Sequence, residues 1–247
     1  MLTKNKGIFS FSQFRNLGVL AAFSTNVLNL NFRNQSISQF EEAFGKFAVA
    51  AGFDPSRAAF FNQVHGANSI EIDAALIGCG WKRLGQELLA VDAGCTVLSN
   101  APIVIFTADC IPLFVADEKA RTVAILHVGW RGADAGIISK TLLKIANEFT
   151  LQISDLTIGI GPSIRSCCYE VGAEFELKFD GWTEFRNEKY YFDLAGFSKD
   201  ALARLGIPEG QMIDSEICTV CHSDFHSHRR DGEKAGRMAS VIMKLVT

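Results

Sequence analysis

The sequence predicts an α+β fold in which helices cover mixed β-sheets, and three observations support this. Helical and strand patterns alternate irregularly along the 247 residues, not in regular βαβ units. Two apolar, β-rich runs, residues 111–116 and 122–128, surround a charged break and predict an antiparallel hairpin. The first run is apolar at both alternating positions, so both of its faces must be covered. We therefore expect one layered sandwich domain across residues 1–247.

The composition is that of a globular protein, with 48% hydrophobic and 21% charged residues. A formal charge of −3 provides no basic surface for nucleic acid or anionic membrane, so we expect neither as a partner. No apolar run approaches the ~18–20 residues of a membrane span. Residues 1–10 lack the apolar core of a signal peptide, and seven irregularly spaced cysteines are typical of reduced thiols. These features predict a cytoplasmic protein.

Before the hairpin, a helix is predicted from Ser38, which opens the capping-box pattern Ser-Gln-Phe-Glu, to Gly52. Four apolar residues of this helix share one stripe: Phe40, Phe44, Phe47 and Ala51. Residues 58–64 and 69–72 predict a strand pair around His65. Residues 88–92 and 103–107 predict two further short strands.

After the hairpin, a helix is predicted over residues 134–149, where four apolar side chains recur at helical spacing: Ile138, Leu142, Ile145 and Phe149. The remaining patterns predict, in order, a strand over 156–160, a helix over 173–179, a strand over 189–193 and a helix over 194–205. The last apolar run, 239–246, fits either a helix or a strand, and we favour a strand. Gly206 is the stop signal for the helix over 194–205.

The register of the hairpin decides whether two chemically active residues meet. A two-residue turn at Glu118-Lys119 pairs Asp117 with Ala120 and places Cys110 opposite His127. A four-residue turn would shift the register by two and leave that pair diagonal on the same face, whereas an odd-length turn would separate the two side chains. The favoured register brings a thiol and an imidazole together at the open end of the hairpin.

His65, at a predicted strand end or turn, completes a His/Cys/His set with Cys110 and His127. Two imidazoles and a thiolate suit zinc, and three protein ligands leave a fourth position for water or substrate. Because the three residues are far apart in sequence, the pattern alone is weakly specific. The alternative is a buried, inert cysteine and two core histidines.

An ordered set of motifs changes that weighting. It comprises residues 62–66 (NQVHG), 91–93 (VDA), 107–112 (TADCIP), 127–132 (HVGWRG), 160–164 (IGPSI), 169–172 (YEVG) and 227–232 (SHRRDG) with Gly236-Arg237. The set resembles the bacterial multicopper-polyphenol-oxidase-like, or laccase-domain, family, also called peptidoglycan editing factors. Members of that family are regarded as zinc-dependent purine nucleoside enzymes. The resemblance runs from about residue 58 to the C-terminus.

The resemblance implies a four-layer α/β/β/α sandwich with mixed sheets. It also implies zinc ligands at His65, Cys110 and His127, and a purine nucleoside and phosphate as substrates. Family members usually carry an arginine-containing Gly-Gly-Val-Ser loop before a Leu-Asn pair. Here Phe23 lies only a few residues before Leu28-Asn29-Leu30. This shortening predicts that one arginine of the substrate or phosphate pocket is missing.

Other candidate site residues adjoin these motifs. Asp109, next to Cys110, is a candidate catalytic base or a group that orients a ligating histidine, and Asp92 is a second candidate for the same roles. Three arginines lie in turn-like segments and could clamp phosphate with bidentate hydrogen bonds: Arg131, Arg229 and Arg230. Surface salt bridges are the alternative role for these arginines.

Residues 218–222, CTVCH, match the C-x-x-C-H pattern of c-type haem attachment. That attachment belongs to exported proteins, so haem is disfavoured here. With His226 and His228 nearby, a second zinc site is an alternative. A purely structural segment is the simplest hypothesis.

The function predicted from the sequence is a zinc-dependent enzyme that acts on adenosine by phosphorolysis, a transferase reaction, by hydrolytic deamination, or by both. One alternative is a cysteine hydrolase with Cys110 as nucleophile and His127 as base. Another is a non-catalytic zinc-binding protein. A multicopper oxidase is disfavoured because one His/Cys/His set lacks the many histidines of such a centre. The sequence contains no indication of oligomeric state.

Overall fold

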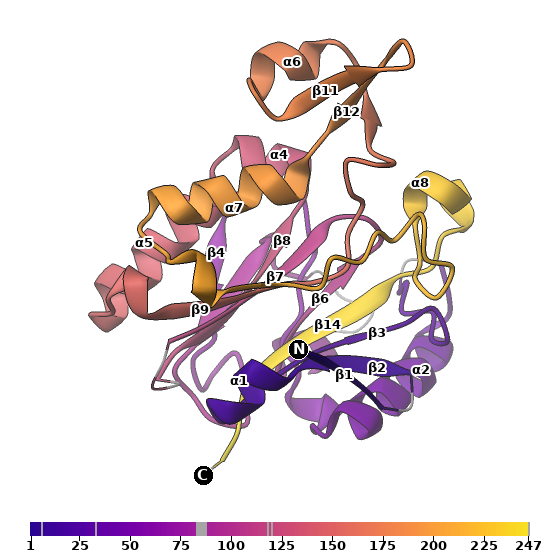
Figure 1. The fold of residues 1–247 in the computed structure, drawn as a ribbon. Helices are drawn as coiled ribbons and strands as arrows, with labels where there is room; N and C mark the ends of the chain where they lie inside the picture. The colour runs from indigo at the N-terminus through magenta and orange to yellow at the C-terminus, as the bar shows by residue number, and fades with distance from the viewer. Residues whose placement is uncertain (6, 33, 83–87, 118, 120, 247) are drawn as a thin grey trace.

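Two β-sheets pack face to face, and helices cover their outer sides (Figure 1). The computed structural model describes residues 1–5, 7–32, 34–82, 88–117, 119 and 121–246. One sheet is antiparallel, with the order β1 (Leu2–Asn5), β2 (Ile8–Phe11), β3 (Val19–Ser24), β14 (Met238–Lys244) and β6 (Ile103–Thr107). The other is mixed, with the order β13 (Met212–Asp214), β9 (Leu156–Ile160), β7 (Ile111–Asp117), β8 (Val123–Val128), β5 (Ala93–Thr96) and β4 (Ser69–Glu71).

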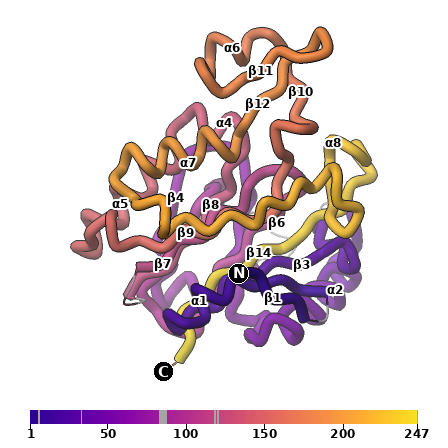
Figure 2. Tube along the Cα trace, in the orientation of Figure 1, coloured from indigo at the N-terminus to yellow at the C-terminus, as the bar shows by residue number. Residues whose placement is uncertain are grey.

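A third, smaller sheet and its helix project beyond the two large sheets (Figure 2). It contains β10 (Glu170–Val171), β12 (Lys189–Phe192) and β11 (Thr183–Arg186). The helices are α1 (Ser12–Asn16), α2 (Ile37–Ala51), α3 (Cys79–Lys82), α4 (Trp130–Asp134), α5 (Ile137–Phe149), α6 (Glu174–Lys178), α7 (Leu194–Arg204) and α8 (His228–Asp231).

The alternation of side chains on each central strand produces the four layers. On β7, Leu113 packs into the apolar layer beneath α5 and α7, whereas the next residue, Phe114, packs between the two sheets. On β3, Phe23 joins that layer between the sheets, whereas Ala22 faces the phenylalanines of α2. The four-layer α/β/β/α sandwich expected from the sequence is therefore confirmed. Only the six-stranded sheet is mixed among the described residues.

The hairpin of β7 and β8 has the four-residue register, so the two-residue turn is wrong. Pro112 pairs with His127, and the Asp117 N–H donates to the Thr122 carbonyl oxygen over 3.2 Å. Residues 118 and 120 of the turn lie outside the described residues. A shift of two positions preserves side-chain parity, so Cys110 and His127 remain on one face, in diagonal positions.

Helix α2 begins two residues earlier than the sequence pattern suggests. Ser36 is the N-cap and forms a reciprocal capping box with Gln39, so the box at Ser38 is wrong. The helix ends as predicted at Gly52, whose φ of 87° places it in the left-handed region. The predicted helix over 134–149 corresponds to α5, which begins three residues later, at Ile137. Gly136, at φ 76°, separates it from α4, which ends at Asp134.

Two strand predictions before the hairpin are also wrong. Residues 58–64 do not pair with 69–72; the segment is irregular and forms one isolated bridge, between Ala59 and Ile103. The segment over 88–92 is irregular too, and β5 begins only at Ala93. By contrast, the predicted strands over 103–107, 156–160, 189–193 and 239–246 and the helices over 173–179 and 194–205 are confirmed within two residues at each end.

Within the described part of the chain, no helix has the length and apolar character needed to cross a membrane.

Candidate functional site

Three side chains from different parts of the chain meet at the open end of the β7–β8 hairpin. The metal-binding atoms of His65, Cys110 and His127 all lie within 4.8 Å of one another. The two imidazole centroids are 4.7 Å apart, with the rings inclined at 69°. His127 is buried, Cys110 is half-buried and His65 is exposed, so the group opens to solvent on the side of His65. The geometry thus combines the three residues that the sequence selected.

The carboxylate of Asp92 positions both histidines through hydrogen bonds. Its carboxylate is fully buried and its Oδ1 lies 2.8 Å from Nδ1 of His127. The same carboxylate accepts the backbone N–H groups of His65, at 2.9 Å, and Gly66, at 2.7 Å. Burial raises the pKa of Asp92, but the hydrogen bonds from His127 and Gly66 outweigh it and the pKa lies below its usual value. Asp92 leaves Nε2 of His127 as the nitrogen available to a ligand.

Cys110 and His127 stabilise each other as charged groups. Burial raises the pKa of Cys110, but its interactions with His127 and His65 lower it to about 6. Burial lowers the pKa of His127, but the charge of Cys110 and the hydrogen bond to Asp92 raise it to about 9. A thiolate is the form of cysteine that binds metals and attacks carbon. The site therefore favours the thiolate form of Cys110.

Gly129 makes the close approach of these groups possible. A Cβ at this position would lie 3.0 Å from Sγ of Cys110 and 3.0 Å from Cδ2 of His65. Any larger residue would push one of the two ligands away, because neither contact has space to spare. The glycine of the His-Val-Gly-Trp segment is therefore part of the site.

The donor set fits a metal ion. Two imidazoles and one thiol are ligands that zinc accepts, and three of them leave an open position. Nδ1 of His127 is hydrogen-bonded to the carboxylate of Asp92, and a carboxylate partner of this kind is usual for a histidine that binds a metal. These features match the requirements of a catalytic metal centre.

A cavity of ≈ 380 Å³ adjoins the metal-binding group. This volume suits a small organic ligand. Arg131 and Arg229 line it together with the three candidate metal ligands. Aromatic rings form much of the remaining wall: Phe32, Phe61, Phe106 and Tyr169. The cavity combines a cationic edge, apolar ring surfaces and the candidate metal position.

Asp109 lines the same cavity and connects its walls. Its backbone has a φ of 90°, unusual for a residue other than glycine. The carboxylate accepts the hydroxyl of Thr219 at 2.6 Å and the backbone N–H of Arg229 at 2.7 Å. The backbone carbonyl of Asp109 accepts the N–H of Ile164 at 2.9 Å. The histidine-orienting hydrogen bond, for which Asp109 and Asp92 were both candidates, is the one made by Asp92.

Two of the three arginines that line the cavity rest on aromatic rings. The guanidinium carbon of Arg131 lies 4.3 Å from the ring centroid of Trp130. That of Arg229 lies 5.4 Å from the ring centroid of Tyr169, and its Nη1 donates to the carbonyl of Glu170 at 2.7 Å. Both side chains are positioned by these contacts while they retain N–H groups for an anion.

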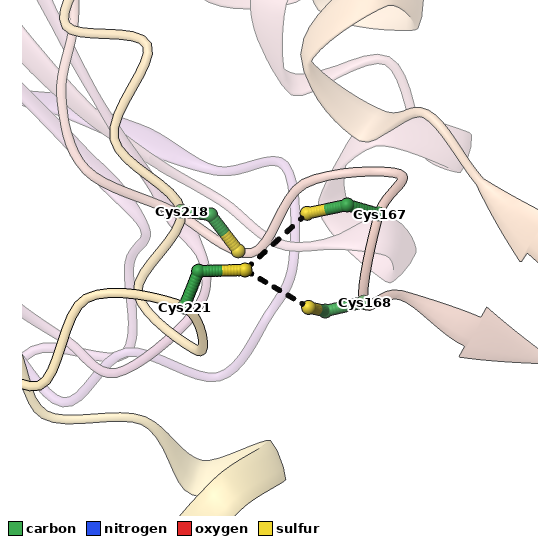
Figure 3. Close-up of side chains that lie close together, drawn as sticks. All are labelled: Cys167, Cys168, Cys218 and Cys221. Atoms are coloured by element: carbon green, nitrogen blue, oxygen red, sulfur yellow. Dashed lines mark hydrogen bonds between the residues drawn. The ribbon is translucent and has the colours of Figure 1, made fainter.

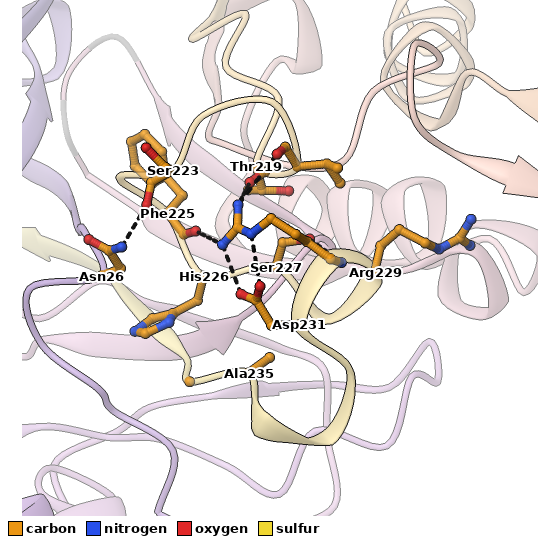
Figure 4. A network of polar contacts seen from close by, with 12 residues as sticks. Asn26, Thr219, Ser223, Phe225, His226, Ser227, Arg229, Asp231 and Ala235 are labelled. Carbon is orange, nitrogen blue, oxygen red and sulfur yellow. Dashed lines mark hydrogen bonds and ion pairs between the residues drawn. The ribbon is translucent and has the colours of Figure 1, made fainter.

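Arg230, the third predicted arginine, is outside the cavity lining. Its guanidinium donates to the carbonyls of Thr219, at 2.9 Å, and Phe225, at 2.8 Å, and pairs with Asp231 at 2.8 Å. Figure 4 shows this network, with Arg229 extending away from it. Arg230 thereby holds together the loop that carries Arg229.

Several cavity residues were not selected from the sequence: Asn31, Gln63, Tyr169, His228 and Arg237. Four of them lie in motifs that had been recognised, so a signal existed for them: Gln63, Tyr169, His228 and Arg237. Gln63 joins its irregular segment to the end of β6, because its side-chain amide donates to and accepts from the backbone of Phe106 at 2.8 Å. Nothing in the local pattern could reveal that contact.

Comparison with known proteins places these features in a wider group. Residues 10–245 match the family model described as multi-copper polyphenol oxidoreductase laccase. A purine nucleoside phosphorylase of Clostridium acetobutylicum is 30% identical over 253 residues, covering 96% of each chain. An adenosine deaminase from an unknown prokaryotic organism is 30% identical over 207 residues, covering 80% of this chain and 79% of that protein.

Two solved structures share the fold over nearly their whole length. The hypothetical protein YfiH of Bacillus licheniformis has a TM-score of 0.91 and 26% identity, covering 99% of both chains. YlmD of Geobacillus stearothermophilus has a TM-score of 0.90 and 25% identity, covering 99% of this chain and 98% of that one.

Proposed function

Because the chain belongs to the multi-copper polyphenol oxidoreductase laccase family, we propose that it is a zinc-dependent enzyme of purine nucleosides, with adenosine as its first substrate. Similar proteins named purine nucleoside phosphorylase and adenosine deaminase support the substrate class. The observation that carries the proposal is the position of His65, Cys110 and His127 at one side of a cavity that also contains cationic and aromatic groups.

In this proposal His65, Cys110 and His127 hold zinc, and Asp92 keeps His127 in the ligating orientation. Zinc supplies Lewis-acid chemistry when bound, polarising an oxygen of water, phosphate or the nucleoside. The half-buried, low-pKa thiol of Cys110 provides the anionic ligand.

The other residues bind and orient the substrates. Arg131 and Arg229 bind phosphate, which must be held near C1′ of the nucleoside for phosphorolysis. The ring of Tyr169 provides a surface on which a purine base stacks. Asp109 moves a proton at its carboxylate, a role that deamination requires and phosphorolysis uses to assist the leaving purine. Arg230 contributes indirectly, through the loop that carries Arg229.

The test is product analysis with adenosine and zinc-replete protein, with and without phosphate. We expect adenine and ribose 1-phosphate only when phosphate is present, and inosine regardless of phosphate. The Cys110→Ser variant, which removes the thiolate ligand, is the control and should form neither product. Absence of both products from the zinc-replete parent protein would reject the proposal and favour a non-catalytic zinc-binding protein.

The contacts of His127 with Cys110 on one side and Asp92 on the other favour a second candidate function, that of a cysteine hydrolase. Without a metal this series has the form of a cysteine–histidine–carboxylate triad, with Cys110 as nucleophile and His127 as base. The two functions differ in one measurement. Iodoacetamide should alkylate Cys110 rapidly in a hydrolase, whereas a zinc ligand should react only after chelation.

A further inference from the structure

Two pairs of cysteines converge outside the cavity. Cys167 and Cys168 lie in the loop between β9 and β10, and Cys218 and Cys221 lie in the segment between β13 and α8. Figure 3 shows the four side chains pointing toward one another from these two segments. Their sulfur atoms all lie within 4.8 Å of one another.

The backbone brings these segments together. Ser163 and Cys218 form a parallel bridge, and the Thr219 N–H donates to the Ser163 carbonyl at 3.0 Å. Nearby, both terminal nitrogens of Arg165 bond to the carboxylate of Asp214, at 2.9 Å and 2.7 Å. These contacts involve none of the four sulfurs, so the convergence of the cysteines is built into the fold.

The sulfur positions match a tetrahedron around one ion. A zinc–sulfur distance of about 2.3 Å gives sulfur–sulfur edges of about 3.8 Å. Two of the six separations in the structure are 3.7 Å, for Cys167–Cys221, and 3.4 Å, for Cys168–Cys221, and all six lie within 4.8 Å. An iron–sulfur cluster requires wider spacing, because several iron atoms lie between the cysteines. A disulfide would join only two of the four.

We propose that Cys167, Cys168, Cys218 and Cys221 bind a second zinc ion in a closed, four-thiolate site. Four protein ligands leave no open position, so this site is structural. Cys218 is buried, whereas Cys167 and Cys221 are exposed and provide the route by which the ion enters.

The site redefines the C-x-x-C-H segment. Its two cysteines pair with Cys167 and Cys168 and not with the histidines considered from the sequence. His222 is exposed and outside the group, and Nε2 of His226 lies 3.1 Å from the Leu28 carbonyl. The ion therefore requires none of these histidines.

The second zinc would stabilise one wall of the cavity. Cys168 precedes Tyr169, which lines the cavity, and Cys218 precedes Thr219, which bonds to Asp109. An ion that joins the two segments holds Tyr169 and Thr219 at a constant separation. The ion is independent of the cavity metal, because the two groups share no ligand.

The test counts metal in the purified chain by inductively coupled plasma mass spectrometry. The parent protein should hold about two zinc ions, and Cys110→Ser should retain about one. Combining Cys110→Ser with Cys167→Ser and Cys221→Ser should remove the remaining zinc. His222→Ala, on the same loop, is the matched control and should keep both ions.

A second measurement remains informative if the multiple variant fails to fold. In the Cys110→Ser protein, the four thiols of the cluster should resist alkylation until a chelator is added, and cobalt reconstitution should produce the intense thiolate-to-cobalt absorption of a tetrathiolate site. Alkylation unaffected by chelation, a Cys168–Cys221 disulfide in protein purified under reducing conditions, or iron in place of zinc would overturn the proposal. Full zinc retention without Cys167 and Cys221 would do so as well.

Discussion

Oδ1 of Asp92 lies 2.8 Å from Nδ1 of His127, and the same carboxylate accepts the backbone N–H groups that precede and follow the His65 side chain. One buried carboxylate thus positions two of the three proposed metal ligands. The third proposed ligand, Cys110, lies close to His127, and this interaction lowers the pKa of the Cys110 thiol. The properties of the site therefore depend on a residue that is not one of the proposed ligands.

The first prediction concerns this carboxylate. Asp92→Asn retains the shape but loses an acceptor for the N–H groups around His65, so the affinity of the cavity site for zinc should fall by roughly 10- to 100-fold. Competition with a chromophoric chelator measures it. Asp73→Asn is the control. Asp73 also accepts backbone N–H groups, from Ala75 and Leu76, but it is exposed and does not line the cavity. Unchanged affinity in Asp92→Asn would remove Asp92 from the site.

The second prediction uses the space at Gly129. Gly129→Ala places a methyl group against Cys110 and His65, so zinc affinity and adenosine turnover should fall roughly tenfold or more while the fold persists. Gly45→Ala is the matched control, since no atom lies within 4 Å of its new Cβ in helix α2. That control should raise the free energy of unfolding by about 0.5–1 kcal/mol. Metal titration and thermal unfolding measure both variants.

The third prediction separates the two proposed reactions. Arg131→Ala removes a charge that only phosphorolysis needs, so phosphate-dependent adenine release should fall roughly tenfold or more, while inosine formation changes little. Chromatography of both products in one assay provides the ratio. Arg204→Ala removes an exposed arginine on α7 and should alter neither product. A proportional loss of both products in Arg131→Ala would show that Arg131 does not act on phosphate.

The fourth prediction distinguishes neighbouring arginines. Arg230→Ala deletes hydrogen bonds to the Thr219 and Phe225 carbonyls and should lower the free energy of unfolding by about 1–3 kcal/mol. Arg229→Ala leaves those bonds intact and should mainly raise the KM for phosphate. Denaturant titration and steady-state kinetics are performed on both variants. The reverse pattern would place Arg230 at the substrate.

The fifth prediction concerns acid stability. Burial raises the pKa of Asp214, but its pairs with Arg165 and Lys199 outweigh this, and the pKa lies below the ordinary 3.8. Because the folded-state pKa is lowered, the carboxylate stabilises the fold above pH ~4, and this contribution disappears as the pH falls through the folded-state value.

Asp214→Asn should therefore lower the free energy of unfolding by about 3 kcal/mol near neutral pH and by much less at pH 2–3. Denaturant titrations at several pH values provide the comparison. Asp200→Asn, which breaks an exposed pair with Arg204, controls for loss of a carboxylate. A deficit in Asp214→Asn that is constant with pH would contradict this role.

Sequence periodicity correctly predicted the helices and strands that have one pattern of buried and exposed side chains along their whole length. The phenylalanine stripe of α2 and the apolar β9 were recognised because their burial follows helical or strand spacing. Residues 58–64 have the same β-rich pattern, and Phe60 and Phe61 are both buried, yet the segment forms only one isolated bridge to β6, between Ala59 and Ile103, and no regular strand. Local patterns report burial, not the presence of a hydrogen-bonding partner.

The sequence could predict the part of the site that depends on the alternation of side chains between the two faces of a strand. Cys110 and His127 remained on one face although the turn was longer than favoured, because a shift of two preserves the alternation. The cysteine cluster had no such signal. Its two pairs are about fifty residues apart, and tertiary contacts such as the bridge between Ser163 and Cys218 bring them together.

The position of β14 has a consequence for synthesis on the ribosome. This strand lies between β3 and β6, so the five-stranded sheet remains two separate pieces until residues 238–244 have emerged. The three residues of the cavity metal site, all within the first 127, are translated long before that. During this interval the strand edges of β3 and β6 that pair with β14 have no partner strand. Such unpaired edges favour association between nascent chains. Ribosomes stalled before residue 238 should therefore carry chains that depend on chaperones.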